Sequence, residues 1–193
     1  MDGQELKIKD STGNPAPLGL LGFGMTTILL NIHNAGFFEL NSMIIGMGIF
    51  MGGLAQIIAG IQEWKKNNTF GATAFTAYGF FWLALVALWL LPSFNTLYVS
   101  KPNGIAVGFF LLVWGLFTTG MFIGTLKLSR ALQVVFASLA VLFFLLAIGD
   151  FAGNKTITVI AGFEGIFCGL SAFYACLGLV INEVHGKKIL PLG

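Results

Sequence analysis

Neutral polar side chains recur along one face of the first long apolar segment, residues 18–38. At about 100° per residue on a helix, Phe23, Thr27, Asn31 and Asn34 fall within about 80° of one another. Polar groups inside an apolar helix are costly and tend to mark transport pathways. Thr hydroxyls can instead bond carbonyls of their own helix, and Asn can cap a helix end. We interpret Asn31 as part of the wall of a path through the protein or of a contact between helices, and for the Thr residues both interpretations stay open.

Other neutral polar residues lie inside further apolar segments. Gln56, in the segment 40–62, is equally suited to bridging two helices and to lining a path. Uncharged amides and hydroxyls can contact an anion without trapping it as a Lys would, but they suit a neutral solute equally well. The residues that we expect to line the path or bind its solute are Thr26, Thr27, Asn31, Asn34, Gln56 and Thr73.

Two titratable residues are candidate proton sites. Glu164 lies well inside the segment 158–181, about 10 Å from its end by helical rise. His33 lies near the end of the segment 18–38. A lone His is more often a structural hydrogen-bond donor than a proton relay, and a Glu at this depth can also sit in a water-filled vestibule. Both residues are therefore kept as candidate proton sites beside these structural alternatives.

Composition excludes several classes of function. Hydrophobic residues make up 56% of the 193 residues, charged residues make up 9%, and mean hydropathy is +0.88. A soluble domain has about 25% charged residues, so the chain cannot form an ordinary soluble domain, and its net charge of +2 is too small for nucleic-acid binding.

Cys168 and Cys176 lie about 12 Å apart along one predicted helix, too far for a disulfide. No enzyme activity, metal or cofactor is expected.

The apolar residues form long uninterrupted segments. Each is about 20 residues long, which is the length that a helix needs to cross a bilayer. The sequence predicts an all-α polytopic membrane protein with an N-terminal tail (1–17), a six-helix transmembrane domain (18–181) and a C-terminal tail (182–193). The six predicted transmembrane helices are 18–38, 40–62, 69–91, 104–126, 131–151 and 158–181.

Basic residues predict the topology. Eight of the ten Lys and Arg residues lie in segments that share one side of the membrane, and only Lys101 and Lys155 lie on the other side. Because cytoplasmic loops carry the excess of Lys and Arg, both termini are expected in the cytoplasm and the protein in the plasma or inner membrane. The eight residues are Lys7, Lys9, Lys65, Lys66, Lys127, Arg130, Lys187 and Lys188.

A motif near the N-terminus points to a known family. The run NPAPLGL at residues 14–20, followed by FGMTT at 23–27, resembles the signature of the acetate uptake transporter family, which contains the succinate–acetate permeases. The resemblance spans nearly the whole chain, and the order of its motifs makes it specific. It continues through residues 31–34, 52–56, 68–75, 124–127 and 182–183.

This resemblance implies a protomer of six helices around its own pore, assembled as a hexamer in the lipid membrane. It also implies a hydrophobic constriction, whose matching positions are Phe23, Tyr78 and Leu139. Glu164 departs from the family pattern, in which an apolar residue is expected. The implied substrates are acetate, with succinate or other short mono- and dicarboxylates as further substrates.

Several alternatives stay open at this level. The carboxylate could pass as an anion, as in a channel, or together with a proton; the lack of a clear proton relay slightly favours the anion. A urea-type channel for small neutral solutes is the rival within transport. A membrane sensor or assembly protein is a second rival, although the short tails offer a partner little surface.

Overall fold

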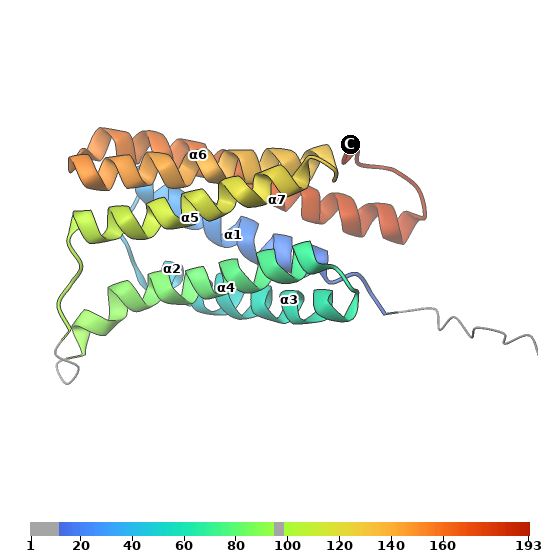
Figure 1. Ribbon diagram of the computed structural model, residues 1–193, viewed down its shortest axis with the longest axis horizontal. Coiled ribbons are helices and arrows are strands. Elements are labelled where there is room, and N and C mark those ends of the chain that lie inside the picture. Colours follow the sequence, from blue (N-terminus) through green and yellow to red (C-terminus); the bar gives the residue numbers. More distant parts are fainter. Residues whose placement is uncertain (1–11, 95–98) are drawn as a thin grey trace, which may run out of the picture.

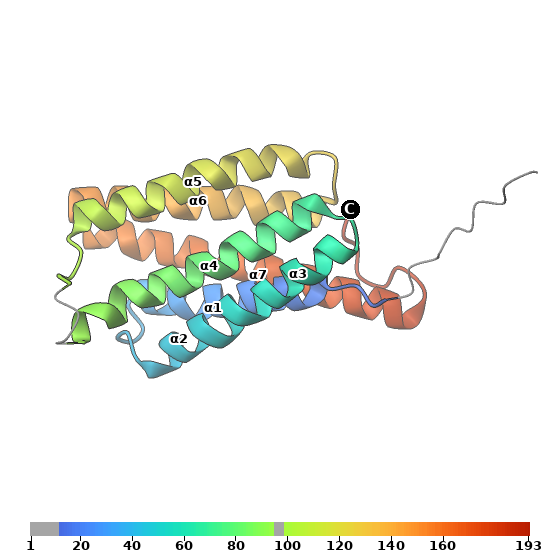
Figure 2. The same cartoon turned by 60° about the horizontal axis from the view of Figure 1, so that its bottom comes forward.

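The computed structural model describes residues 12–94 and 99–193, so Lys7 and Lys9 of the expected cytoplasmic tail lie outside the described residues. All regular structure within this part of the chain is helical, and six helical spans are long and apolar enough to cross a membrane. They run side by side as an elongated bundle (Figures 1 and 2). The spans are α1 (Ala16–Asn34), α2 (Ser42–Met47) with η1 (Gly48–Ala55) and α3 (Gln56–Lys65), α4 (Thr69–Leu90) with η2 (Leu91–Ser93), α5 (Gly104–Thr125), α6 (Arg130–Ala152) and α7 (Lys155–His185).

Capping side chains set the ends of most helices. An Asn or Ser side chain accepts a backbone N–H in the first turn of α2, α4, α5, α6 and α7. Helix α1 begins differently, inside the NPAP motif, where a proline near the first helical position costs no hydrogen bond. Glycines in the left-handed conformation, Gly153 and Gly186, end α6 and α7.

The helix bounds differ from the expected segments mainly in α1 and α7. Helix α1 ends at Asn34 rather than 38, because Gly36 adopts a positive φ of 92° and turns the chain. Helix α7 runs from Lys155 to His185, beyond the expected 158–181, because polar residues continue the helix past the apolar run. The first and last helices therefore extend into the predicted tails 1–17 and 182–193.

The helices pack in a closed order around the interior. Helix α7 packs on α1 and α6, α1 packs on η1 and α3, α3 packs on α4, and α5 packs on α6. Aromatic rings rather than close backbones join α4 to α5. The ring of Phe81 lies 5.5 Å from that of Phe110 and 5.2 Å from that of Trp114, and Tyr78 lies 5.7 Å from Phe117. The interior between these helices is therefore walled largely by apolar side chains.

The backbones of α1 and α7 approach each other closely at glycines. A Cβ atom on Gly24 would lie 2.9 Å from the carbonyl oxygen of Gly169, and one on Gly169 would lie 2.8 Å from the carbonyl oxygen of Gly24. In lipid, helices associate through such close packing of small residues, because no hydrophobic drive operates between them. Glycine at these positions therefore permits the α1–α7 contact.

We expect Gly169→Ala to lower the free energy of unfolding by about 2 kcal/mol, because the new methyl group would meet the backbone of α1. Gly46→Ala is the matched control, since a Cβ there meets nothing within 4 Å. Thermal unfolding of the purified protein in detergent measures both changes. Equal stability of the two variants would contradict the proposed importance of the α1–α7 contact.

Candidate functional site: a series of cavities inside the protomer

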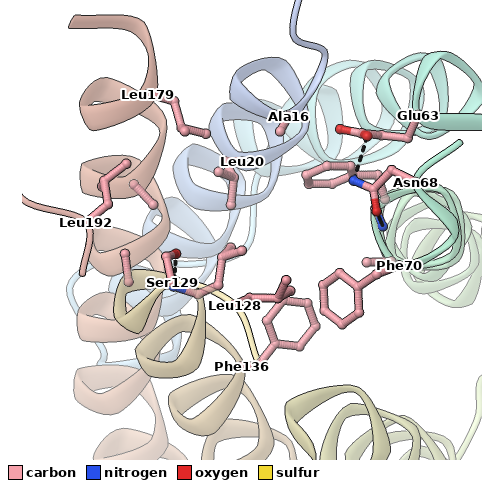
Figure 3. A pocket seen from close by; sticks show the side chains of 16 residues that line it. Ala16, Leu20, Glu63, Asn68, Phe70, Leu128, Ser129, Phe136, Leu179 and Leu192 are labelled. Atoms are coloured by element: carbon pink, nitrogen blue, oxygen red, sulfur yellow. Dashed lines mark hydrogen bonds between the residues drawn. The ribbon is translucent and has the colours of Figure 1, made fainter. Parts of the chain in front are cut away.

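Three cavities follow one another along the inside of the bundle. We call the end of the bundle that carries Lys65, Lys66, Lys127 and Arg130 the basic end. A cavity of about 170 Å³ lies there, and Figure 3 shows the side chains that line it. A central cavity of about 20 Å³ follows, and a cavity of about 290 Å³ lies at the opposite end. Shared lining residues join neighbouring cavities, so that they form one series. The basic-end and central cavities share Leu20, Ala74, Phe75 and Phe136, and the central and opposite-end cavities share Phe23 and Leu139.

The central cavity is the narrowest point of this series. Phe23 from α1, Tyr78 from α4 and Leu139 from α6 all line it and are all buried. The rings of Phe23 and Tyr78 lie 6.2 Å apart. A volume of about 20 Å³ holds about one water molecule, since one water needs roughly 10–15 Å³ of such space. The structure thus brings the three expected constriction residues together at the tightest place.

The hydroxyl of Tyr78 is turned away from the cavity series toward α5. It lies 2.9 Å from Thr118 Oγ1, and that hydroxyl donates to the Trp114 carbonyl at 2.7 Å. Because Thr118 has one proton to donate, Tyr78 is the donor in the first bond. The ring is also packed against Phe117 and Phe136, at 5.7 and 6.1 Å. Tyr78 therefore presents an aromatic ring, fixed in place, at the narrow point.

Gln56 lies beside the constriction, where the π-helical η1 gives way to α3. Its side chain is fully buried and lines the central cavity. Nε2 donates to the Gly52 carbonyl at 2.7 Å, within the same span, while Oε1 is buried and has no hydrogen-bond partner. Of the two roles considered for Gln56, this geometry favours lining the path. The unpaired oxygen can accept a hydrogen bond from water or from a protonated solute.

The polar stripe of α1 lines the opposite-end cavity. Thr27, Asn31, His33 and Asn34 all contribute to its wall, with Phe23 at the junction with the constriction. Asn31 donates to the Thr27 carbonyl at 2.9 Å and accepts a hydrogen bond from Asn34 at 3.0 Å. These bonds hold the amide groups in a fixed row. The row leads from the mouth of the cavity toward the constriction.

Two residues that line the same cavity each carry a buried hydrogen-bond donor without a partner. The donors are the hydroxyl of Thr27 and the indole N–H of Trp82, and both residues are 2% exposed. Buried polar groups are nearly always paired, so unpaired donors call for an acceptor such as water or a carboxylate oxygen. Sequence reasoning passed over Trp82, because a Trp in an apolar helix is usually a packing residue. Trp82 lies four residues after Tyr78 and so on the same helix face, and this spacing could have identified it as a residue of the path.

His33 is held by a structural hydrogen bond. Its Nδ1 lies 2.7 Å from the carbonyl oxygen of Phe38, and because a carbonyl only accepts, Nδ1 carries the proton. The bond ties the end of α1 to the loop that follows. The ring nevertheless lines the opposite-end cavity together with Asp150. The geometry supports the structural alternative for His33 without removing it from the cavity wall.

Three of the expected site residues lie away from the cavities. Thr26 is buried but bonds the Met47 carbonyl at 3.3 Å and so ties α1 to α2. Thr73 is exposed on the outside of the protomer, because five residues place it about 140° around α4 from Tyr78. Glu164 is partly exposed on α7; one of its oxygens is buried without a partner, but it lines none of the three cavities. The expected lining role of Thr26 and Thr73 is thus corrected.

Comparison with known proteins relates the chain to membrane transporters. The model of the GPR1/FUN34/yaaH family matches residues 3–187. The chain is 58% identical over 180 residues to the succinate-acetate/proton symporter SatP of Escherichia coli K12. The aligned region covers 93% of this chain and 95% of that protein. It is 34% identical to acetate permease A of Emericella nidulans, over 93% of this chain and 65% of that one. The solved structure of the bacterial acetate channel SatP matches with a TM-score of 0.93 and 57% identity, over 95% of this chain and 100% of that one.

The Tyr78–Thr118 hydrogen bond predicts unequal effects of its two partners on stability. Tyr78→Phe leaves Thr118 bonded to Trp114 and should cost about 1 kcal/mol. Thr118→Val leaves the Tyr78 hydroxyl buried and unpaired, and should cost about 2 kcal/mol. The double variant should cost less than the sum. Unfolding in detergent measures all three variants, and strictly additive effects would show that this bond does not hold Tyr78.

Proposed function

The chain belongs to the GPR1/FUN34/yaaH family, and on that premise we propose that it carries acetate, and succinate or other short carboxylates, across the membrane through the interior of each protomer. The acetate transporter resemblance noted in the sequence is confirmed by this match. The carboxylate passes as an anion or together with a proton. The names of the relatives reflect both modes, since one is called a symporter and another a channel.

The observation that carries this proposal is the uncharged constriction between two wider cavities. Among the described residues that line the three cavities there is no Lys or Arg. A fixed cation would hold a carboxylate tightly, whereas hydroxyls, amides and an indole N–H bind it weakly enough to let it leave. The central cavity admits about one water, so a solute must shed its water shell to pass. These features suit a small carboxylate with a short apolar tail.

We further propose that the basic end faces the cytoplasm, with both termini on that side of the plasma or inner membrane, because Lys and Arg gather there. A hexamer is the proposed assembly, as the family resemblance implies. The outward face of α5 is apolar, with Phe109, Val113 and Leu116 each about 60% exposed, and it suits contact with lipid or with neighbouring copies. An enzyme is not proposed, because the relatives are transporters and channels.

The purified protein in liposomes should admit radiolabelled acetate faster than protein-free liposomes do, and should not admit urea faster. The protein-free control removes the passage of acetic acid through lipid itself. Faster entry of urea but not of acetate would favour the neutral-solute channel. Binding of acetate without any flux would favour the sensor alternative and contradict our proposal.

Leu139→Ala should widen the constriction and raise the ratio of butyrate to acetate flux about tenfold, because one or two methylene groups are worth about 1–3 kcal/mol in an apolar site. Val141→Ala is the matched control, since Val141 lies on the same helix but is 49% exposed on its outer face. Flux of both acids into liposomes measures the ratio. An unchanged ratio in Leu139→Ala would show that Leu139 does not determine which carboxylates pass the constriction.

A further inference from the structure

We propose that Glu63 is the proton acceptor for carboxylates that pass through the protein. In this role it takes a proton from the substrate in the basic-end cavity and releases it to a second, solvent-facing hollow. The inference rests on the proposed function and deepens it, because it assigns the proton-linked mode to a named residue. Sequence reasoning placed the candidate proton sites at His33 and Glu164 instead.

Glu63 is a buried acid with an unsatisfied oxygen. It lies on the last turns of α3, and only 2% of its side chain is exposed. Oε2 accepts a hydrogen bond from Asn68 Nδ2 at 2.8 Å, while Oε1 is buried and has no partner. Figure 3 shows the carboxylate reaching from α3 toward Ala16 at the rim of the basic-end cavity. Because buried polar atoms are nearly always paired, Oε1 calls for a hydrogen-bond donor, and the cavity that Glu63 lines is where a solute can supply one.

Glu63 also stands between two cavities. Glu63 and Asn68 line the basic-end cavity on one side and a hollow of about 350 Å³ on the other. The remaining lining residues of that hollow are mostly polar, which suits water. They are Thr12, Asn14, Pro15, Lys66 and Glu183. A proton on Glu63 can therefore leave through this hollow without returning through the substrate path.

Few charged groups face Glu63. Lys66, three residues along the chain, interacts with it electrostatically and also donates a hydrogen bond to the Thr12 carbonyl. Glu183, from α7, lines the same hollow. The described residues that α1, α4, α6 and α7 contribute to the basic-end cavity are all uncharged. Within the described chain, Lys66 and Glu183 are thus the only other titratable groups that line either space.

The transfer can be written as two balanced steps. A carboxylic acid that has crossed the uncharged constriction donates its O–H to Oε1; the substrate O–H bond breaks, a Glu63 O–H bond forms, and the substrate leaves as its carboxylate. Glu63 then gives the proton to water in the second hollow and becomes a carboxylate again. One proton and one carboxylate reach the same side. The neutral acid avoids the high cost of placing a bare anion in the narrow apolar cavity.

A purely structural role for Glu63 is the alternative to exclude. The residue sits beside the first turn of α4, where its Asn68 partner also caps Gly71. Glu63→Gln keeps the size of the side chain and an acceptor for Asn68, but it cannot take up a proton. A structural role therefore predicts that this variant behaves like the wild type, whereas the proton-acceptor role does not.

The test measures labelled acetate uptake into liposomes, less the uptake into protein-free liposomes, with and without an external pH one unit below the internal pH. The wild-type protein should respond to the imposed gradient with a several-fold rise in uptake. Glu63→Gln should lose the rise, because its amide cannot take up the proton of the substrate, and Glu63→Asp should keep it. Glu183→Gln is the matched control, since it removes an acid from the same hollow and should keep the full response.

A gradient response in Glu63→Gln equal to that of the wild type would overturn the inference, as would a wild-type protein that does not respond to the gradient. If Glu63→Gln is folded but inactive, a Glu63→Asp variant without the response would overturn it as well. A wild-type protein that carries neither acetate nor succinate would instead reject the proposed function itself. The two failures are therefore distinguishable.

Discussion

Desolvation at the centre of the bundle is the constraint on which the rest of the structure depends. Phe23, Tyr78 and Leu139 leave a cavity of about 20 Å³, so a solute that crosses it gives up nearly all of its water. A bare carboxylate pays heavily for that loss in apolar surroundings. Polar groups on the two sides of the constriction suit the two forms of the solute: the unpaired donors of Thr27 and Trp82 suit the anion on one side, and the unpaired oxygen of Glu63 suits the protonated acid on the other.

The remaining contacts keep this narrow point from collapsing or opening. The hydrogen bond from Tyr78 to Thr118 fixes the ring from the side of α5, where aromatic rings replace close backbone packing. The glycine contact between Gly24 and Gly169 brings α1 against α7 and so sets the position of Phe23. The π-helical η1 precedes Gln56 and delivers its side chain to the central cavity. A π-helical turn inside an α-helix is a frequent feature of functional sites.

The sequence was sufficient for the six spans and for the polar stripe, because both follow from periodicity and length. The sequence placed Thr73 on the path wrongly. Thr73 and Tyr78 are about 140° apart around α4 and so face different sides, but the sequence did not show which side of α4 faces the interior. The sequence also favoured Glu164 over Glu63 as a candidate proton site, since depth within an apolar segment suggested burial. In the fold Glu63 is the more buried of the two, because the loop between α3 and α4 brings Asn68 over it near the end of α3. Such burial depends on packing between helices, which one sequence does not reveal.

The central claim is that the carboxylate passes through the interior of one protomer at Leu139. Modification of Leu139→Cys with methyl methanethiosulfonate tests it most directly, because the native Cys168 and Cys176 line none of the three cavities and should leave the wild-type protein insensitive. We predict that the reagent blocks acetate flux in Leu139→Cys, that acetate slows the block, and that Val141→Cys on the outer face keeps its flux. Full flux through Leu139→Cys, once mass spectrometry shows complete modification, would contradict the claim.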